Sequence, residues 1–128
     1  MCIRDRVELA ELIDRLRAML VQGLAAGRVV EANLEQVSIA GIRATALALV
    51  FSELLQNALE HGSGSVRIEL AQRNGNVVLA IRDEGAGPGD AAEGTGLSIV
   101  GALVRDELQG SFALIDDGGT RAEVVFPI

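Results

Sequence analysis

The stretch ELLQNALEHG at residues 53–62 carries three polar side chains along one side of an Ala- and Leu-rich helix. Glu53, Asn57 and His61 are spaced four residues apart, so each is rotated by only about 40° from the one before it. The neighbouring stripe is apolar and predicts a face packed on a core; it consists of Leu47, Val50, Leu54 and Ala58. We therefore expect a carboxylate, an amide and an imidazole along the edge of a buried helix face.

The composition indicates one small acidic domain with an aliphatic core. The chain has 128 residues, enough to bury roughly two-thirds of its unfolded surface in a single domain. Hydrophobic residues make up 49% of it, but the aromatic ones are all Phe. The formal net charge is −7 and every basic residue is Arg, which disfavours binding to nucleic acid or to anionic membranes.

The ends and the cysteine content suggest a protein of a reducing compartment. Cys2 is the single cysteine, which excludes an internal disulfide, so we expect a cytoplasmic location. No apolar run approaches the ~20 residues of a membrane helix, and no membrane contact is expected from this segment. Residues 1–6, MCIRDR, do not continue the pattern that follows; we interpret them as a non-native or boundary remnant, with residues 7–128 as the domain.

Hydrophobic periodicity predicts three helices and two strand hairpins. The helices are expected over residues 7–24, 42–60 and 96–108, and the hairpins over 65–83, with a turn at Asn74-Gly75, and over 111–128. One or two short strands are expected within residues 28–39. The apolar positions that predict the first and third helices are Val7, Leu9, Leu12, Ile13, Leu16 and Leu20, then Leu97, Ile99, Val100, Leu103 and Val104. Because two strand pairs are hairpins, we expect a two-layer α/β sandwich, with a mixed β-sheet and three helices on one face.

Two polar residues fall on positions that should face the core. In the strand at 76–83, the alternation that turns Val77, Leu79 and Ile81 inward also turns Asp83 inward. In the closing hairpin the same reasoning places Thr120 with Ala122, Val124 and Phe126. A carboxylate and a hydroxyl are therefore expected at the edge of the core.

Asp83 opens the run DEGAGPG and needs a hydrogen-bond donor, because an unpaired buried carboxylate is costly. An adenine amino group would supply that donor, and Gly85 and Gly87 would let the backbone approach a flat ring closely. The alternative is a tight turn after a strand, in which Asp83 caps amides of the loop.

The run GTG at residues 94–96 precedes the third helix and would expose its first N–H groups to a phosphate, although ordinary capping explains it equally well. Asn57 offers a neutral oxygen suited to Mg²⁺, and Glu53 could accept or orient a proton. Alternatively, both are solvent-facing residues of an amphipathic helix. His61 precedes Gly62 and is interpreted as a helix cap or pocket wall.

Together these segments resemble the catalytic ATP-binding domain of sensor histidine kinases, in the GHKL superfamily with its Bergerat fold. ELLQNALEHG resembles the N box, DEGAGPG the first glycine box, GTGLSIV the second, and GGTRAEVVFP the closing Gly-Thr strand. The resemblance covers about residues 7–128, with the motifs in family order and spacing.

The resemblance implies ATP and Mg²⁺ as cofactors and a role for each matching residue. Glu53 would be the catalytic carboxylate and Asn57 would bind Mg²⁺. Asp83 would read the adenine amino group, with Thr120 beside it. The remaining nucleotide contacts implied by the motifs are His61, Gly85, Gly87, Gly94, Thr95, Gly96 and Leu97, and the glycines among them would form the hinges of a lid.

The chain also departs from the family pattern. The lid between Gly87 and Gly94 is very short and lacks a Phe-containing motif, which is typical of a short-lid subgroup of soluble histidine kinases. Glu60 stands where many relatives carry a basic residue. No phospho-accepting histidine lies upstream, so the expected partners are histidine-bearing dimerisation helices, missing here, and a response regulator.

Two other functions fit the same sequence. An anti-sigma-type serine protein kinase has the same fold and a similar length, and it would phosphorylate a serine on an antagonist protein. A non-catalytic nucleotide-binding regulator would keep the pocket for protein association alone. The presence of both Glu53 and Asn57 favours a catalytic domain over the regulator.

Overall fold

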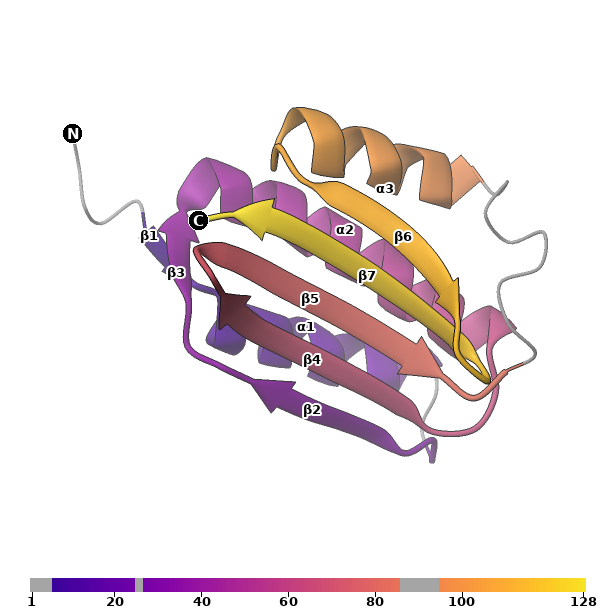
Figure 1. Ribbon diagram of the computed structural model, residues 1–128. Coiled ribbons are helices and arrows are strands. Elements are labelled where there is room, and N and C mark those ends of the chain that lie inside the picture. Colours follow the sequence, from indigo (N-terminus) through magenta and orange to yellow (C-terminus); the bar gives the residue numbers. More distant parts are fainter. Residues whose placement is uncertain (1–5, 25–26, 86–94) are drawn as a thin grey trace.

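The computed structural model describes residues 6–24, 27–85 and 95–128. In these ranges two strands lie between successive helices, and the larger of the two sheets lies across the helices (Figure 1). In chain order the elements are β1 (Arg6–Glu8), α1 (Leu9–Leu24), β2 (Val30–Leu34), β3 (Ser38–Ala40), α2 (Gly41–His61), β4 (Val66–Arg73), β5 (Asn76–Asp83), α3 (Thr95–Asp106), β6 (Ser111–Asp116) and β7 (Thr120–Pro127).

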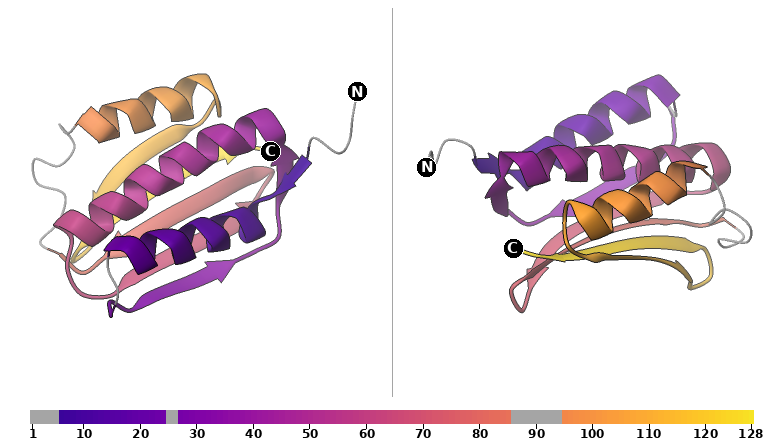
Figure 2. Two further views of the ribbon diagram at one scale, coloured as in Figure 1. Left: turned by 180° about the vertical axis from the view of Figure 1, so that it is seen from behind. Right: turned by 90° about the horizontal axis from the view of Figure 1, so that it is seen from above.

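The main sheet has five strands in the order β2-β4-β5-β7-β6. β2 runs parallel to β4, and the other neighbouring pairs are antiparallel. All three helices lie on one face of this sheet, with α2 between α1 and α3 (Figure 2). The predicted two-layer sandwich of a mixed sheet and three helices on one face is confirmed.

The hydrophobic core lies between the sheet and the helices, and α2 contributes the most buried residues to it. The predicted apolar stripe of α2 is buried throughout, and Phe51 of α2 is fully buried in the same core. From the sheet, β5 contributes Val77, Leu79 and Ile81, as the alternation predicts. The closing strand β7 contributes Ala122, Val124 and Phe126. Burial of this many aliphatic side chains, at about 25 cal/mol per Å² of apolar surface, is the main force that holds the two layers together.

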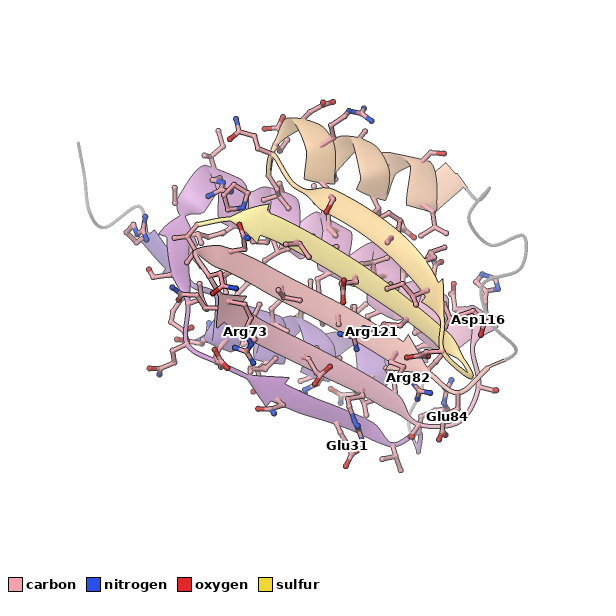
Figure 3. All side chains as sticks on the ribbon, viewed as in Figure 1. Glu31, Arg73, Arg82, Glu84, Asp116 and Arg121 are labelled. Carbon is pink, nitrogen blue, oxygen red and sulfur yellow. The ribbon has the colours of Figure 1, made fainter. Side chains whose placement is uncertain are left out.

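The face of the sheet opposite the helices is held by ion pairs. Arg121 donates to Glu69 and to Glu123, each at 3.2 Å, and so spans β5 from β7 to β4. Burial would lower the pKa of Arg121, but its hydrogen bonds with these two carboxylates outweigh that effect and raise the pKa. Ala80 lies between Glu69 and Glu123 in the strand register and is only 1% exposed. Figure 3 shows Arg121 near the middle of this face.

The two hairpin turns follow their sequence signals. Asn74 and Gly75 have φ angles of 54° and 83°, the left-handed pair that a two-residue turn between β4 and β5 needs. Gly118 has a φ of 92° in the turn between β6 and β7. Both predicted hairpins are therefore confirmed, and so are the two short strands within residues 28–39.

The first helix begins later than predicted, at Leu9 instead of Val7. The Glu8 carboxylate accepts the N–H groups of Ala10 at 2.8 Å and Glu11 at 3.1 Å, so it caps the first turn. Val7 is in β1 and pairs with Ile39 of β3. Its apolar side chain packs on the core from a strand, which helical spacing alone could not distinguish from a first helical turn.

Arg6 is part of the folded domain, although the sequence groups it with the preceding residues. It pairs with Ala40 in the small β1–β3 sheet and donates to the Ser38 carbonyl oxygen at 2.6 Å. Of the expected remnant, residues 1–6, the first five lie outside the described residues.

Ile99, one of the apolar positions that predict the third helix, does not face the core. It is 54% exposed, whereas Leu97, Val100 and Val104 are buried. Those three follow the i, i+3, i+7 spacing of one helical stripe, and Ile99 is rotated by about 100° from Val100. Within the described ranges, no helix combines the length and the apolar character needed to cross a membrane.

Candidate functional site

Four elements meet at one end of the domain. The last residues of α2 and β5, the first residues of β7 and the start of α3 all lie at the right-hand end of the view in Figure 1. The antiparallel pairing of β5 with β7 places Asp83 opposite Thr120 at this end. Three of the polar features predicted from the sequence are therefore brought together: the α2 stripe, Asp83 and Thr120.

Asp83 is the only buried polar or charged residue in the part of the chain that the structure describes, with 4% of its surface exposed. Its Oδ1 atom accepts the N–H of Gly85 at 2.7 Å. The capping role considered for Asp83 therefore exists, and it occupies one of the two carboxylate oxygens. The other oxygen, Oδ2, lies against the backbone of Gly62 at the end of α2.

Glycines surround Asp83 on several sides and leave no room for side chains. A Cβ atom added to Gly62 would lie 2.5 Å from both Cγ and Oδ2 of Asp83. A Cβ atom on Gly119, at the start of the closing strand, would overlap the backbone carbonyl oxygen of Asp83. One added to Gly85 would lie 2.8 Å from Oδ1. The carboxyl group is thus held in a cradle of backbone atoms.

Thr120 is half-buried on the same face of the sheet as Asp83. Its hairpin is fixed from the other face, where Arg82 donates from Nε to the Asp117 carboxylate at 3.1 Å. The Nη2 group of Arg82 also donates to the Asp117 carbonyl oxygen at 3.3 Å. These contacts tie the turn between β6 and β7 to the strand that carries Asp83.

The polar stripe of α2 ends at this cradle. Glu53 and Asn57 are half-buried and His61, the last residue of the helix, is exposed. At 1.5 Å of rise per residue, Asn57 lies about 8 Å and Glu53 about 14 Å back along the helix from Gly62. A ligand that begins at Asp83 and runs along α2 would therefore meet Asn57 before Glu53.

The glycine motifs are only partly within the described residues. Gly85 lies two residues beyond the end of β5 and is part of the cradle around Asp83. Gly87 and Gly94 lie outside the described residues, as does the short lid between them. Thr95 and Gly96 form the first residues of α3. Leu97 is 6% exposed and packs in the hydrophobic core, so packing alone accounts for its presence.

The sequence did not indicate the residues that hold the loop after α2, which spans residues 62–65. Arg28 donates to the Gly64 carbonyl oxygen at 2.7 Å and 3.0 Å and to the Leu59 carbonyl oxygen at 3.0 Å, so it caps the end of α2. Glu84, the residue after β5, holds the same loop through Ser63 and Ser65. An Arg before a strand and a Glu after an Asp carry no local signal of these contacts.

A magnesium ion would find few protein ligands here. No group of three or more His, Cys, Asp or Glu side chains is placed to hold a metal within residues 6–24, 27–85 and 95–128. Mg²⁺ often uses one or two protein oxygens and takes its other ligands from phosphates and water. The amide oxygen of Asn57 fits that role only if a phosphate-bearing ligand supplies the remaining ligands.

Comparison with known families decides the relationship. The family model of histidine kinase-, DNA gyrase B- and HSP90-like ATPases matches residues 42–128, which include α2, Asp83 and the closing hairpin. The chain belongs to this ATPase family. The resemblance drawn from the N box, the glycine boxes and the Gly-Thr strand is therefore confirmed at the level of the family.

Curated relatives of this ATPase-family domain are sensor histidine kinases. The sensor histidine kinase PdtaS of Mycobacterium tuberculosis is 32% identical over 145 aligned residues, which cover 100% of this chain and 28% of the relative. PdtaS of Mycolicibacterium smegmatis is 30% identical, with 100% and 29% covered. The chain thus spans less than a third of the length of these relatives.

Solved structures of histidine kinases share the fold. The histidine kinase domain of the blue-light activated kinase EL346 from Erythrobacter litoralis superposes with a TM-score of 0.86 at 24% identity, covering 94% of this chain and 61% of that one. The mycobacterial sensor histidine kinase MprB gives a TM-score of 0.82 at 23% identity, with 95% of each chain covered. The fold is therefore that of histidine kinase catalytic domains.

Proposed function

We propose that this ATPase-family domain binds ATP and Mg²⁺ and is the catalytic domain of a two-component sensor histidine kinase. It would transfer the γ-phosphoryl group of ATP to a histidine on a separate dimerisation segment. The observation that carries the proposal is the buried Asp83 in its glycine cradle, opposite Thr120 and at the end of the α2 stripe. The similarity to sensor histidine kinases over the full chain supports it.

In this proposal, Asp83 and Thr120 recognise adenine. Oδ1 of Asp83 is engaged by Gly85, and Oδ2 is the oxygen left to accept the exocyclic amino group of the base. Thr120 offers a hydroxyl from the facing position on β7, directly or through a water molecule. The absence of side chains at Gly62 and Gly85 leaves room for the Asp83 carboxyl group that would accept this hydrogen bond.

The phosphates would then extend along α2 toward Asn57 and Glu53. The helix N-terminus formed by Thr95 and Gly96 would offer backbone N–H groups to a phosphate, which suits a chain with a net charge of −7 and no lysine. The amide oxygen of Asn57 would be the protein ligand of Mg²⁺, which neutralises charge on the phosphates when bound. His61, exposed at the end of α2, would border the nucleotide.

Glu53 would act on the incoming nucleophile. In the transfer, an imidazole nitrogen of the acceptor histidine forms a bond to the γ-phosphorus as the bond to the bridging oxygen of ADP breaks. The Glu53 carboxylate would orient the imidazole or accept its N–H proton. Most of the rate enhancement would come from positioning and charge neutralisation.

The partners that follow are histidine-bearing dimerisation helices and a response regulator that receives the phosphoryl group. A cytoplasmic setting fits this chemistry, because ATP and a reducing environment for Cys2 are both found there. The very short sequence between Gly87 and Gly94 resembles the abbreviated lids of soluble histidine kinases and supports this proposal.

Titration calorimetry tests the nucleotide site. A non-hydrolysable ATP analogue is titrated with and without Mg²⁺ into the wild-type chain and into Asp83→Asn. We expect saturable binding that Mg²⁺ strengthens and that the variant weakens greatly, since an amide presents an N–H group where the base needs an acceptor. A folded wild-type chain that binds no nucleotide at millimolar concentration would refute the proposal.

The acid stability of the product identifies the acceptor. The chain is mixed with radiolabelled ATP and a histidine-bearing helical segment taken from one of the sensor kinases that it resembles. Phosphohistidine is lost in acid and phosphoserine is not, so an acid-labile label is expected. An acid-stable label would instead support the serine protein kinase considered from the sequence.

A further inference from the structure

Glu84, the residue that follows β5, makes two hydrogen bonds to the loop of residues 62–65. The N–H of Glu84 donates to the Ser63 carbonyl oxygen at 2.9 Å, and the Glu84 carboxylate accepts the N–H of Ser65 at 2.7 Å. Glu84 thus uses its backbone and its side chain on two alternate residues of the loop. It lies just beyond the end of β5 (Figure 3), directly after Asp83.

The same loop begins with the glycine that touches Asp83. A Cβ on Gly62 would lie 2.5 Å from Cγ and Oδ2 of Asp83, closer than real Cβ atoms approach other heavy atoms. Its φ of −89° and ψ of −175° are open to any residue, so space, and not backbone conformation, requires glycine here. The Asp83 carboxyl group occupies the volume that a side chain at Gly62 would take.

The carboxyl group is therefore held between two backbone segments. On one side the N–H of Gly85 donates to Oδ1, and on the other side the backbone of Gly62 lies close to Oδ2 and restricts its position. The position of Gly62 is fixed in turn by the hydrogen bonds of Glu84 with Ser63 and Ser65. A shift of the loop would open the space beside Oδ2 and let the carboxyl group rotate.

We propose that Glu84 and Gly62 are positioning residues that set the direction of the Asp83 carboxyl group and thereby the selectivity for adenine. The inference rests on the proposed function, because it assumes that Asp83 recognises the base. Glu84 acts through the loop and need not touch the nucleotide. Its loss would reduce discrimination between bases more than it reduces affinity for the phosphates.

The test compares two nucleotides that differ at the recognised position. ADP carries the exocyclic amino group, and IDP carries a carbonyl oxygen in its place. Calorimetry gives the dissociation constants of both, with Mg²⁺, for the wild type, Glu84→Ala, Glu84→Gln and Gly62→Ala. In the wild type we expect a preference for ADP, and in Glu84→Ala and Gly62→Ala a preference reduced by about tenfold, the usual effect of one misplaced hydrogen bond.

Glu84→Gln supplies the conservative comparison. Its side-chain amide keeps an oxygen that can accept the Ser65 N–H, so most of the preference for ADP should return. The dissociation constant of IDP should change by less than about threefold in all three variants, because the contacts to phosphate are unaltered. If Glu84 and Gly62 had a merely structural role, their substitution would weaken the binding of ADP and of IDP equally.

Two control substitutions match these changes away from the site. Gly23→Ala adds a methyl group in α1, where a Cβ would meet no heavy atom within 4 Å. Glu35→Ala removes a carboxylate that accepts the Gln72 N–H at 3.1 Å, a bond of the same kind at the opposite end of β4. Both controls should keep the wild-type preference, and thermal melting should show every variant folded.

The outcomes separate the two proposals. If folded Glu84→Ala keeps the wild-type preference, the positioning role is overturned, and this variant decides alone should Gly62→Ala fail to fold. An equal loss of ADP and IDP binding would also overturn it. If the wild type binds no ADP, or if Asp83→Asn keeps the preference, the proposed function itself fails and this inference falls with it.

Discussion

Asp83 and Thr120 form the last rung of the β5–β7 pair, and both side chains face the helix layer. Further along the same strands, the facing pairs are Ile81 with Ala122 and Leu79 with Val124, all buried in the core. The strand pair thus carries its apolar rungs into the core and ends on a polar one. That change from apolar to polar marks where the core stops and the candidate nucleotide site begins.

The Thr120 hydroxyl is expected to contribute to nucleotide binding. Thr120→Val keeps the shape and removes the hydroxyl, so ADP should bind about fivefold to tenfold more weakly, the cost of one lost hydrogen bond. Thr120→Ser should restore the affinity. Calorimetry with ADP and Mg²⁺ measures the effect. As a control, Thr45→Val removes the hydroxyl that donates to the Gly41 carbonyl oxygen at 3.1 Å, far along α2, and should leave ADP binding unchanged.

Asn57 is expected to couple nucleotide binding to Mg²⁺. In the wild type, Mg²⁺ should strengthen ADP binding, and in Asn57→Ala most of that gain should disappear because the protein ligand is lost. The measurement is the ratio of ADP dissociation constants without and with Mg²⁺. Gln56→Ala changes the neighbouring, half-buried amide residue and should keep the wild-type ratio. If Asn57→Ala keeps the wild-type ratio of dissociation constants, Asn57 is not the protein ligand of Mg²⁺.

Glu53 is expected to act on transfer and not on binding. Glu53→Gln keeps the size and polarity of the side chain but removes its ability to accept a proton. Phosphoryl transfer to a histidine-bearing segment should slow by about a hundredfold or more, with the ADP dissociation constant nearly unchanged. Single-turnover assays with radiolabelled ATP measure the rate. Glu60→Gln alters an exposed carboxylate on the same helix and serves as the control.

Arg43 is expected to stabilise the domain at the end opposite the site. It donates to the carbonyl oxygens of Leu108 at 3.0 Å and Pro127 at 2.6 Å, and its guanidinium carbon lies 5.3 Å from the centre of the Phe126 ring. Arg43→Met keeps the aliphatic part and loses these contacts, which should cost about 1–2 kcal/mol in urea unfolding.

Arg15→Met is the matched control for that substitution. Arg15 is 75% exposed and pairs with Glu11 on α1, so its loss should change the free energy of unfolding by less than about 0.5 kcal/mol. Nucleotide binding should be unaffected in both variants. Equal effects of the two substitutions would mean that the contacts of Arg43 contribute no more than an exposed ion pair does.

Much of the fold could be predicted because its signals are local. Strand alternation places Asp83 and Thr120 on the inner face, and the Asn74-Gly75 pair specifies the turn between β4 and β5. In contrast, β1 spans only three residues, too few for strand alternation to be recognised. Val7 also fits the helical spacing of the residues after it, so the predicted first helix began there. The sequence of α3 also leaves its buried face undefined, since a short helix with apolar residues on two sides, Ile99 among them, does not specify one buried stripe.

The support of the site could not be predicted, because it depends on contacts between distant residues. The approach of Gly62 to Asp83 follows from the way α2 lies on β5, and a glycine after a helix already has an ordinary explanation as a cap. The grip of Glu84 on Ser65 and the capping of α2 by Arg28 also join residues far apart in the sequence. Motifs indicate the residues proposed to bind the nucleotide, whereas only the folded chain identifies the residues that hold them in place.

Low pH should weaken the hydrogen bond between the Glu84 carboxylate and the N–H of Ser65. Hydrogen bonds from the backbone N–H and the side chain of Ser65 lower the pKa of Glu84, and the charges of Arg82 and Arg67 add to this effect. A carboxyl group whose pKa is lower in the folded state stabilises the fold above its unfolded pKa, about 4.3 for Glu, and loses this effect as the pH falls through the folded pKa. Glu84→Gln cannot titrate, so the difference in stability between it and the wild type should be constant from about pH 5.5 to 7 and shrink below about pH 4.

Glu35 allows the same measurement at the other end of β4. Hydrogen bonding to the Gln72 N–H, and then to Arg73, lowers the pKa of Glu35, so Glu35→Gln should show the same direction of pH dependence in urea unfolding. The two sites share no contact partner, and their effects should add in the double variant. A wild-type advantage over Glu84→Gln that persists unchanged at pH 3.5 would show that the bond to Ser65 does not require an ionised carboxylate.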